Sequence, residues 1–357
     1  MRITKLDGLR GVFSLMIVLF HYRENFLPEF LRQLFFIREA YTFVDFFFVL
    51  SGYVIAVNYN KLSTWFEFKV YIKKRFIRLF PLLFFTTTVV LIFDLIGNYY
   101  FPNLVANVDS LPTLLLRYLD TLCFTNATPI LGSTSGINGV SWSISSEMIS
   151  YLVFGVVSAI SFKQKRSLIL ILVIISAVVF SVYNGSFINT GDYGFIRGLI
   201  SFNLGYFVWK LSQKQIKIKN GFEYLIPVFL LLIFYIINKY LSGLEKEMFI
   251  LAVIPLFFGL SILILLKTNG ILSKWLSSKP MVFLGDISYS VYLNHALLVI
   301  VSPKVVFGIL DVPENTITEI TLLALTVIFT VFYSYLTFIY IELKGKKILS
   351  KLVFKDK

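Results

Sequence analysis

The first apolar run of the chain carries two ionisable side chains at a spacing that suits proton transfer. Arg10 and His21 lie in "LDGLRGVFSLMIVLFHY", with ten residues between them. On a helix, eleven positions make about three turns, so both side chains share one face, about 16 Å apart along the axis. Ionisable groups inside a membrane usually mark function, and histidine exchanges protons near neutral pH. The pair predicts that His21 acts as a buried base. The alternative is a snorkelling arginine and a structural histidine.

A basic cluster suggests a second kind of chemistry, the binding of phosphate. The stretch "YIKKRFIRLFP" contains Arg75 and Arg78. Guanidinium groups match phosphate oxygens with paired hydrogen bonds, so these two residues and Arg10 predict a cationic vestibule for a phosphorylated ligand. The alternative is that positive charge gathers on cytoplasmic loops without any ligand.

Other polar residues in the apolar runs suit a sugar. Carboxylates accept hydrogen bonds from hydroxyls, and an aromatic ring stacks on the apolar face of a sugar. Glu147 is a further predicted catalytic residue, and the predicted substrate-binding residues are Asp45, Trp142, Ser143, Arg197 and His295. The carboxylates and the tryptophan are expected in the outer half of the membrane, apart from the cationic vestibule on the inner side. The alternatives are a membrane-interface tryptophan and, for Asp45 and Glu147, a structural pairing with an arginine.

These side chains need a scaffold that brings them together inside a membrane. Of the 357 residues, 57% are hydrophobic and 15% are charged, and apolar runs near the length of a bilayer span recur along the chain. Only helices and closed barrels satisfy the backbone in lipid, and the runs lack the alternation of strands. We predict an all-α, polytopic helix bundle of about ten transmembrane helices, near residues 9–26, 41–57, 80–97, 141–160, 167–184, 194–210, 222–241, 247–266, 283–302 and 318–341.

The distribution of lysine and arginine orients this bundle. Most of the 33 basic residues fall on one side if the N-terminus is cytoplasmic, which predicts an N-in, C-in topology. The same bias explains the net charge of +13 without a nucleic-acid partner. The longest outer segment, 98–140, contains an interrupted apolar stretch, either an interfacial or re-entrant helix or an ordinary amphipathic loop helix. We expect a single integral-membrane domain over residues 1–357, with no appended soluble domain.

Several classes of chemistry find no support in the sequence. Cys123 is the only cysteine, and the two histidines lack the spacing of metal ligands, so no metal site is expected. No phosphate-loop or dinucleotide-binding glycine motif occurs. We therefore expect no tightly bound cofactor and no nucleic acid. The oligomeric state stays open.

Five stretches, in order, resemble the integral-membrane acyltransferase family 3, whose members acylate surface polysaccharides and related glycans. "KLDGLRGVFSLMIVLFHY" resembles its R-x10-H signature, and "FVDFFFVLSGYVI" resembles the span that follows. "RFIRLFP", "SWSISSE" and "LGDISYSVYLNH" resemble its R-x-x-R-x-x-P, W-S-x-x-x-E and G-x-x-S-Y-x-x-Y-L-x-H segments. The resemblance covers nearly the whole chain. One departure occurs in "FIYIELKGKK", where Glu342 lacks the proline that often follows it in the family.

The resemblance implies a reaction, its partners and a location. The donor would be cytoplasmic acyl-CoA, usually acetyl-CoA, and the acceptor a cell-surface or lipid-linked glycan at a bacterial inner membrane, with membrane lipids around the protein. Arg10 and His21 match the family's essential pair, and Arg75 and Arg78 match its arginine motif. His21 would take the proton of the sugar hydroxyl, or would accept the acyl group itself and pass it on. The alternative function is a glycan or lipid carrier without covalent chemistry.

Overall fold

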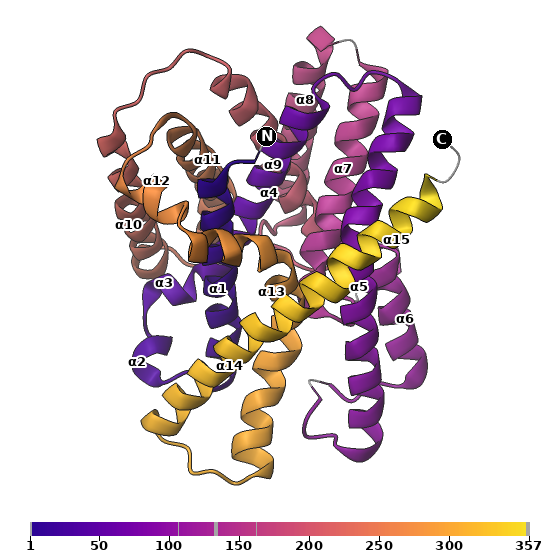
Figure 1. Ribbon diagram of the computed structural model, residues 1–357, viewed down its shortest axis with the longest axis vertical. Coiled ribbons are helices and arrows are strands. Elements are labelled where there is room, and N and C mark those ends of the chain that lie inside the picture. Colours follow the sequence, from indigo (N-terminus) through magenta and orange to yellow (C-terminus); the bar gives the residue numbers. More distant parts are fainter. Residues whose placement is uncertain (1, 106, 132–134, 162, 355–357) are drawn as a thin grey trace.

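The computed structural model describes residues 2–105, 107–131, 135–161 and 163–354, and within these ranges it contains helices and no strand (Figure 1). The long helices match the predicted spans: α1 (Thr4–Phe26), α4 (Phe43–Tyr59), α5 (Trp65–Tyr100), α7 (Trp142–Ile160), α8 (Lys163–Asn184), α9 (Gly194–Ser212), α10 (Leu225–Tyr240), α11 (Gly243–Lys267), α13 (Lys279–Pro303) and α14 (Thr316–Thr337). Shorter helices are α2 (Glu29–Arg32), α3 (Phe35–Arg38), α6 (Leu111–Leu122), α12 (Ile271–Leu276) and α15 (Lys344–Val353). Three-residue to six-residue 3₁₀ or π turns complete the chain: Ala40–Thr42, Gly139–Ser141, Asn220–Tyr224, Lys304–Ile309 and Phe338–Leu343.

The composition of these helices is that of a multi-pass membrane protein. In the described part of the chain, eight helical stretches are long and apolar enough to cross a membrane. They contain every predicted span except α1 and α9. These two helices carry the charged residues Arg10 and Arg197, which suit the interior of a bundle better than a lipid-facing surface. The all-α polytopic bundle is confirmed, whereas ten crossings and the N-in, C-in orientation stay predictions.

α1 and α13 run parallel in close contact because small residues face each other where they meet. A Cβ atom on Gly11 would lie 2.6 Å from the backbone nitrogen of Gly285. This approach brings Arg10 against the Gly285 carbonyl, and ten residues further along each helix it sets His21 opposite His295. Alternating spans require the same direction for the first and the ninth span, as this pair has.

A second group of parallel helices packs around α9. A Cβ on Gly198 would lie 2.8 Å from the Ser146 Cβ of α7, and a Cβ on Gly205 would collide with the backbone of α4. The rings of Phe154 and Phe202 fill the space between α7 and α9 and are fully buried. α4 and α7 are thereby fixed beside each other, and both face the α1–α13 pair.

The chain after α5 folds back along that helix instead of forming a separate outer loop. α6 lies beside α5 in Figure 1, and the Phe124 ring, just after α6, lies 6.1 Å from the Phe76 ring, next to the arginine cluster. Further along, the Asn138 side chain donates to the Leu293 carbonyl of α13 at 3.1 Å. α7 therefore begins well inside the bundle, and the residues of its first turns lie deeper than a start at the outer surface would place them.

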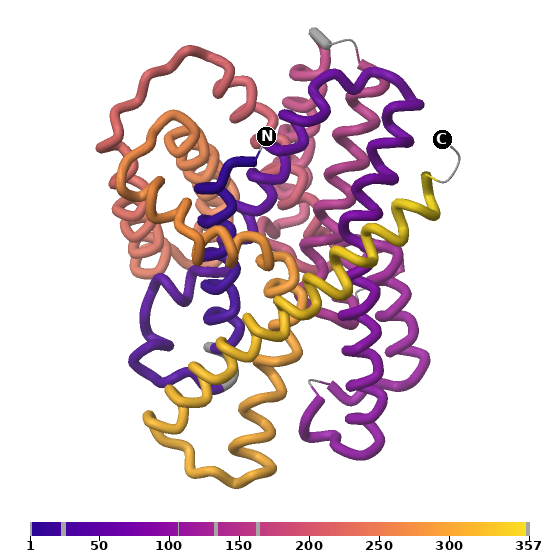
Figure 2. Tube along the Cα trace, in the orientation of Figure 1, coloured from indigo at the N-terminus to yellow at the C-terminus, as the bar shows by residue number. Residues whose placement is uncertain are grey.

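The C-terminal part of the described chain is one continuous rod. Figure 2 shows α14, the π-helical turn Phe338–Leu343 and α15 joined end to end. A Cβ on Gly345 would lie 2.6 Å from the Pro81 Cβ, so the rod lies directly on α5. The absence of a proline after Glu342 agrees with this geometry, because the helix continues through that position.

Candidate active site

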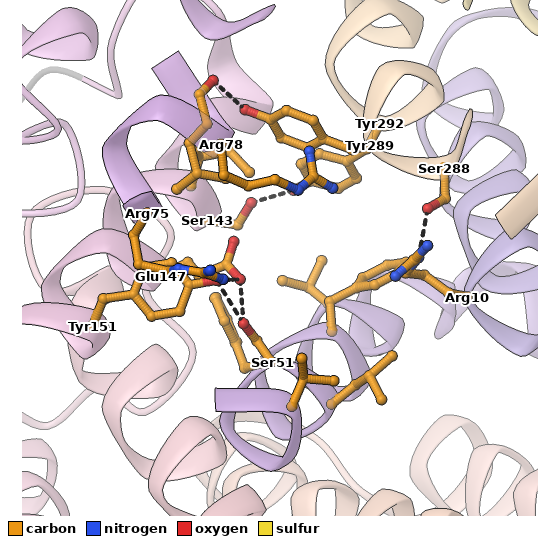
Figure 3. Close-up of a pocket in the computed structure, with 17 residues that line it drawn as sticks. Arg10, Ser51, Arg75, Arg78, Ser143, Glu147, Tyr151, Ser288, Tyr289 and Tyr292 are labelled. Atoms are coloured by element: carbon orange, nitrogen blue, oxygen red, sulfur yellow. Dashed lines mark hydrogen bonds between the residues drawn. The ribbon is translucent and has the colours of Figure 1, made fainter. Parts of the chain in front are cut away.

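A cavity of about 180 Å³ lies between α1, α4, α5, α7 and α13 and collects many of the predicted charged residues (Figure 3). Apolar side chains from α4, such as Val44, Phe47 and Phe48, form part of its wall. Its polar lining consists of Arg10, Ser51, Arg75, Arg78, Ser143, Glu147, Tyr151, Ser288, Tyr289 and Tyr292. The structure thus brings together five predicted site residues, Arg10, Arg75, Arg78, Ser143 and Glu147.

Arg10 is fixed at the cavity wall by α13. Its guanidinium donates to the Ser288 hydroxyl at 2.8 Å and to the Gly285 carbonyl at 2.6 Å. Asp7, one turn earlier, lies 3.3 Å from the same guanidinium. These contacts leave Arg10 half-buried and rigidly oriented, as a binding group should be.

Arg75 and Arg78 line the same cavity but differ in their partners. Arg75 donates to the Tyr59 hydroxyl at 3.3 Å, and its guanidinium carbon lies 5.9 Å from the centre of the Tyr151 ring. Within the described ranges, no carboxylate lies at ion-pair distance from Arg75. Arg78 instead forms an ion pair with Glu342. Arg75 is therefore the less neutralised of the two and the better anion site.

Glu147 is held by two hydroxyl groups through a single carboxylate oxygen. Ser51 and Tyr151 both donate to its Oε1, Tyr151 at 2.5 Å. No side chain in the described part of the chain donates to Oε2. One oxygen therefore fixes the group, and the other stays available to a ligand.

The predicted separation of Glu147 from the arginines is wrong. From its place in the apolar run, Glu147 is predicted in the outer half of the membrane, apart from the cationic vestibule. In the structure Glu147 lines the same cavity as Arg75 and Arg78. The reason is that α7 begins inside the bundle, so its second turn reaches the level of the arginine cluster.

His21 and His295 form a pair beside the cavity. Their ring centroids lie 5.1 Å apart, and neither is among the described residues that line the cavity. Tyr292 connects the two places, because it lines the cavity and its ring lies 5.7 Å from that of His295. The Tyr292 hydroxyl accepts from Ser143 at 2.8 Å and donates to the Val140 carbonyl at 3.0 Å. Tyr292 therefore lies between the cavity and the imidazole of His295.

Asp45, Arg197 and Trp142 pack on one another outside the cavity lining. The Arg197 guanidinium binds both carboxylate oxygens of Asp45, with its closest contact at 2.6 Å, and both side chains are 2% exposed. Trp142 is buried under the same guanidinium, with 5.6 Å from the guanidinium carbon to the ring centre. For Asp45, this geometry is the structural pairing given above as the alternative. Sugar binding by these three residues would require the bundle to open.

Several cavity residues were not predicted as site residues. Tyr289 and Tyr292 lie in the quoted "SYSVYLNH", three positions apart and hence on one helix face. Tyr151 follows Glu147 by four positions, which is also a same-face spacing. Glu342, noted only for its missing proline, proves to contact both Arg78 and Ser290, the latter at 3.0 Å. The helical spacing around known candidates was the available signal.

Comparisons with known proteins identify a family and several relatives of this chain. The family described as "Acyltransferase domain" matches residues 3–339. The O-acetyltransferase OatA of Staphylococcus aureus, from strains NCTC 8325 / PS 47, COL and MRSA252, is 26% identical over 322 residues, which cover 83% of this chain and 50% of the relative. The chain thus spans about half the length of these curated relatives. No solved structure matches it significantly.

The family match covers every helix that builds the cavity and the histidine pair. It includes Arg10, His21, the arginine cluster, Glu147 and His295, and it ends just before Glu342. The motifs, the fold and the match therefore agree that this chain belongs to the integral-membrane acyltransferase family 3.

Proposed function

We propose that the protein is a membrane O-acyltransferase that moves an acyl group, acetyl in the simplest case, from cytoplasmic acyl-CoA to a hydroxyl of a cell-surface or lipid-linked glycan. The observation that carries this proposal is one cavity lined by three arginines and a carboxylate, beside a pair of imidazoles. The name of the O-acetyltransferase relatives supports acetyl as the group transferred. Since the relatives are bacterial, we also propose the bacterial inner membrane as its location.

The arginines suit the donor because coenzyme A carries phosphates. Arg10 and Arg78 are fixed by neighbours on α13 and in the turn Phe338–Leu343, and no carboxylate among the described residues lies at ion-pair distance from Arg75. Guanidinium groups bind phosphate oxygens with charge-assisted hydrogen bonds. The predicted N-in orientation puts the start of α1, and hence Arg10, on the cytoplasmic side, where the donor is made.

The chemistry requires a base within reach of the reacting groups. Transfer breaks the C–S bond of the thioester and forms a C–O bond, and the hydroxyl proton ends on the departing thiolate by way of His21. In the other sequence of steps, His21 attacks the thioester and the thiol leaves with the imidazole proton. The hydroxyl oxygen then attacks the acyl-imidazole, the acyl C–N bond breaks, and the hydroxyl proton returns to His21. Both sequences use the same position of His21, so the geometry is compatible with either.

Acyl transfer by the purified protein tests the proposal. The protein in lipid nanodiscs, supplied with acetyl-CoA and glycan from cells that lack the gene, is expected to release free thiol and form acetyl esters on the glycan. Thiol titration and mass spectrometry measure the two products. Transport of glycan or lipid without any release of thiol would overturn the enzyme and favour a carrier.

Removal of Arg75 or Arg78 is expected to weaken donor use. Each charge-assisted hydrogen bond to a phosphate contributes about 1.5–3 kcal/mol, so Arg75→Ala and Arg78→Ala should each raise the apparent KM for acetyl-CoA roughly tenfold to hundredfold. Lys74→Ala is the matched control, because this exposed neighbour lies outside the cavity lining. Unchanged KM values in both arginine variants would leave only the bias of cytoplasmic loops to explain these residues.

A further inference from the structure

A second cavity adjoins the first at the end where α1 begins. Its volume is about 520 Å³, and it shares Arg10, Arg78, Leu50 and Val54 with the first cavity. We call it the mouth chamber, and its charged lining consists of Arg2, Asp7, Arg10, Arg78, Asp286 and Lys346. Because α1 begins here, the predicted orientation makes the mouth chamber the cytoplasmic entrance to the site.

Most of the cations of the mouth chamber are already neutralised. Arg2 binds Asp7 at 2.9 Å and Asp286 at 2.5 Å, and Arg10 also lies within 3.3 Å of Asp7. Arg78 pairs with Glu342. These ion pairs shape the chamber, but they leave little net charge for an incoming anion.

Lys346 is the exception. It lines the mouth chamber from α15, its side chain is exposed, and within the described ranges no carboxylate lies at ion-pair distance from it. Its position is anchored on both sides of the helix start, because Glu342 binds Arg78 and Gly345 packs on Pro81. The rod of α14 and α15 therefore delivers one uncompensated positive charge to the entrance.

The sizes of the two cavities indicate that each would hold a different part of a thioester donor. Pockets for whole ligands usually measure about 300–1,000 Å³, so the first cavity, at about 180 Å³, is too small for a whole nucleotide thioester and suits its slender acyl-bearing arm with the phosphate at the end of that arm. The mouth chamber has the size for the bulky nucleotide end. Arg10 and Arg78 line both spaces and mark the junction.

We propose that the mouth chamber binds the phosphate-bearing nucleotide end of the donor and that Lys346, on the C-terminal helix α15, contacts these phosphates. The inference rests on the proposed function and adds to it a donor-binding segment outside the family match, which ends at residue 339. Anionic lipid headgroups offer the same phosphate chemistry to an exposed lysine, so the experiment must separate the two sources.

Two thioesters that differ only in phosphates provide the test. Acetyl-CoA carries the nucleotide, and S-acetylpantetheine has the same acyl-bearing arm without any phosphate. Lys346→Ala, purified in a neutral detergent without anionic lipid, is expected to raise the KM for acetyl-CoA about tenfold, with kcat and the kinetics of S-acetylpantetheine unchanged. Lys346→Arg should keep the wild-type KM. Lys347→Ala is the control, because it removes the same charge from the next position, which does not line the chamber.

Each other outcome is decisive. A wild-type KM for acetyl-CoA in Lys346→Ala would overturn the proposal that the mouth chamber binds the donor's phosphates. An equal rise in KM for both thioesters would overturn it as well. An effect that appears only in vesicles with anionic phospholipid, and equally in Lys347→Ala, assigns Lys346 to lipid. Calorimetric titration with coenzyme A itself tests donor binding separately from the reaction. If the protein transfers no acyl group but Lys346→Ala weakens its binding of coenzyme A, the phosphate site in the mouth chamber is supported and only the proposed function is overturned. A wild-type protein that binds no coenzyme A overturns both.

Discussion

Replacement of His21 by alanine is expected to abolish acyl transfer while the protein still folds and binds its donor. A positioned base contributes about 10²–10⁴-fold to the rate, and alanine has no nitrogen that could accept an acyl group. His21 is not among the described residues that line the first cavity, which holds Glu147, or the mouth chamber. Coenzyme A affinity should therefore stay at the wild-type value in His21→Ala.

The measurement pairs turnover with binding on one purified sample. Thiol release from acetyl-CoA reports turnover, and calorimetry with coenzyme A reports the donor site. Labelled acetyl-CoA without acceptor separates the two roles of His21, because only the acyl-imidazole sequence leaves label on the wild-type protein that is missing from His21→Ala. A folded His21→Ala protein with wild-type turnover would end the assignment of His21 to the reaction.

Much of the helical architecture was predictable from the sequence, because apolar runs of bilayer length leave few alternatives. Each of the ten predicted spans corresponds to a long helix. The parallel contact of α1 and α13 fits the predicted alternation. The side of the membrane cannot be read from these contacts, so the N-in, C-in orientation still depends on the distribution of basic residues.

The site was predictable in its membership but not in its arrangement. Arg10, Arg75 and Arg78 meet in one cavity, as their types suggest, and Glu147, which is predicted apart from them, lines the same cavity. Their depths depend on where α7 starts, and this depends on how the preceding connection packs on α5 and α13, which no local pattern records.

Ion pairs between residues far apart in the chain could not be predicted from the sequence for a related reason. Asp45 and Arg197 are 152 positions apart, and only the packing of α4 on α9 shows that they neutralise each other. The same is true of Arg78 and Glu342, which are 264 positions apart. A sequence identifies a costly charge inside a membrane, but the fold decides whether a ligand or another side chain compensates it.

Glu147 offers a substitution that removes charge with little change in shape. Ser51 and Tyr151 both donate to Oε1, and an amide oxygen in glutamine can accept both hydrogen bonds. The nitrogen of glutamine then takes the place of Oε2, which has no donor among the described side chains. Glu147→Gln is therefore expected to keep the fold and to remove only the negative charge and one acceptor.

We expect Glu147→Gln to slow acyl transfer roughly tenfold to hundredfold, the effect of losing a charged hydrogen-bond acceptor of about 1.5–3 kcal/mol, with the affinity for coenzyme A unchanged. Tyr151→Phe is the matched control, because it removes one donor to Oε1 and leaves the carboxylate in place.

If the carboxylate acts on the reacting groups, kcat falls in Glu147→Gln much more than in Tyr151→Phe. If instead it serves only to balance the arginines of the cavity, its loss lowers the melting temperature and the donor affinity together. Thermal unfolding and calorimetry on the same purified variants measure both quantities. A joint loss would make Glu147 a structural residue, since a group that acts only in the reaction has no reason to change the stability of the bundle.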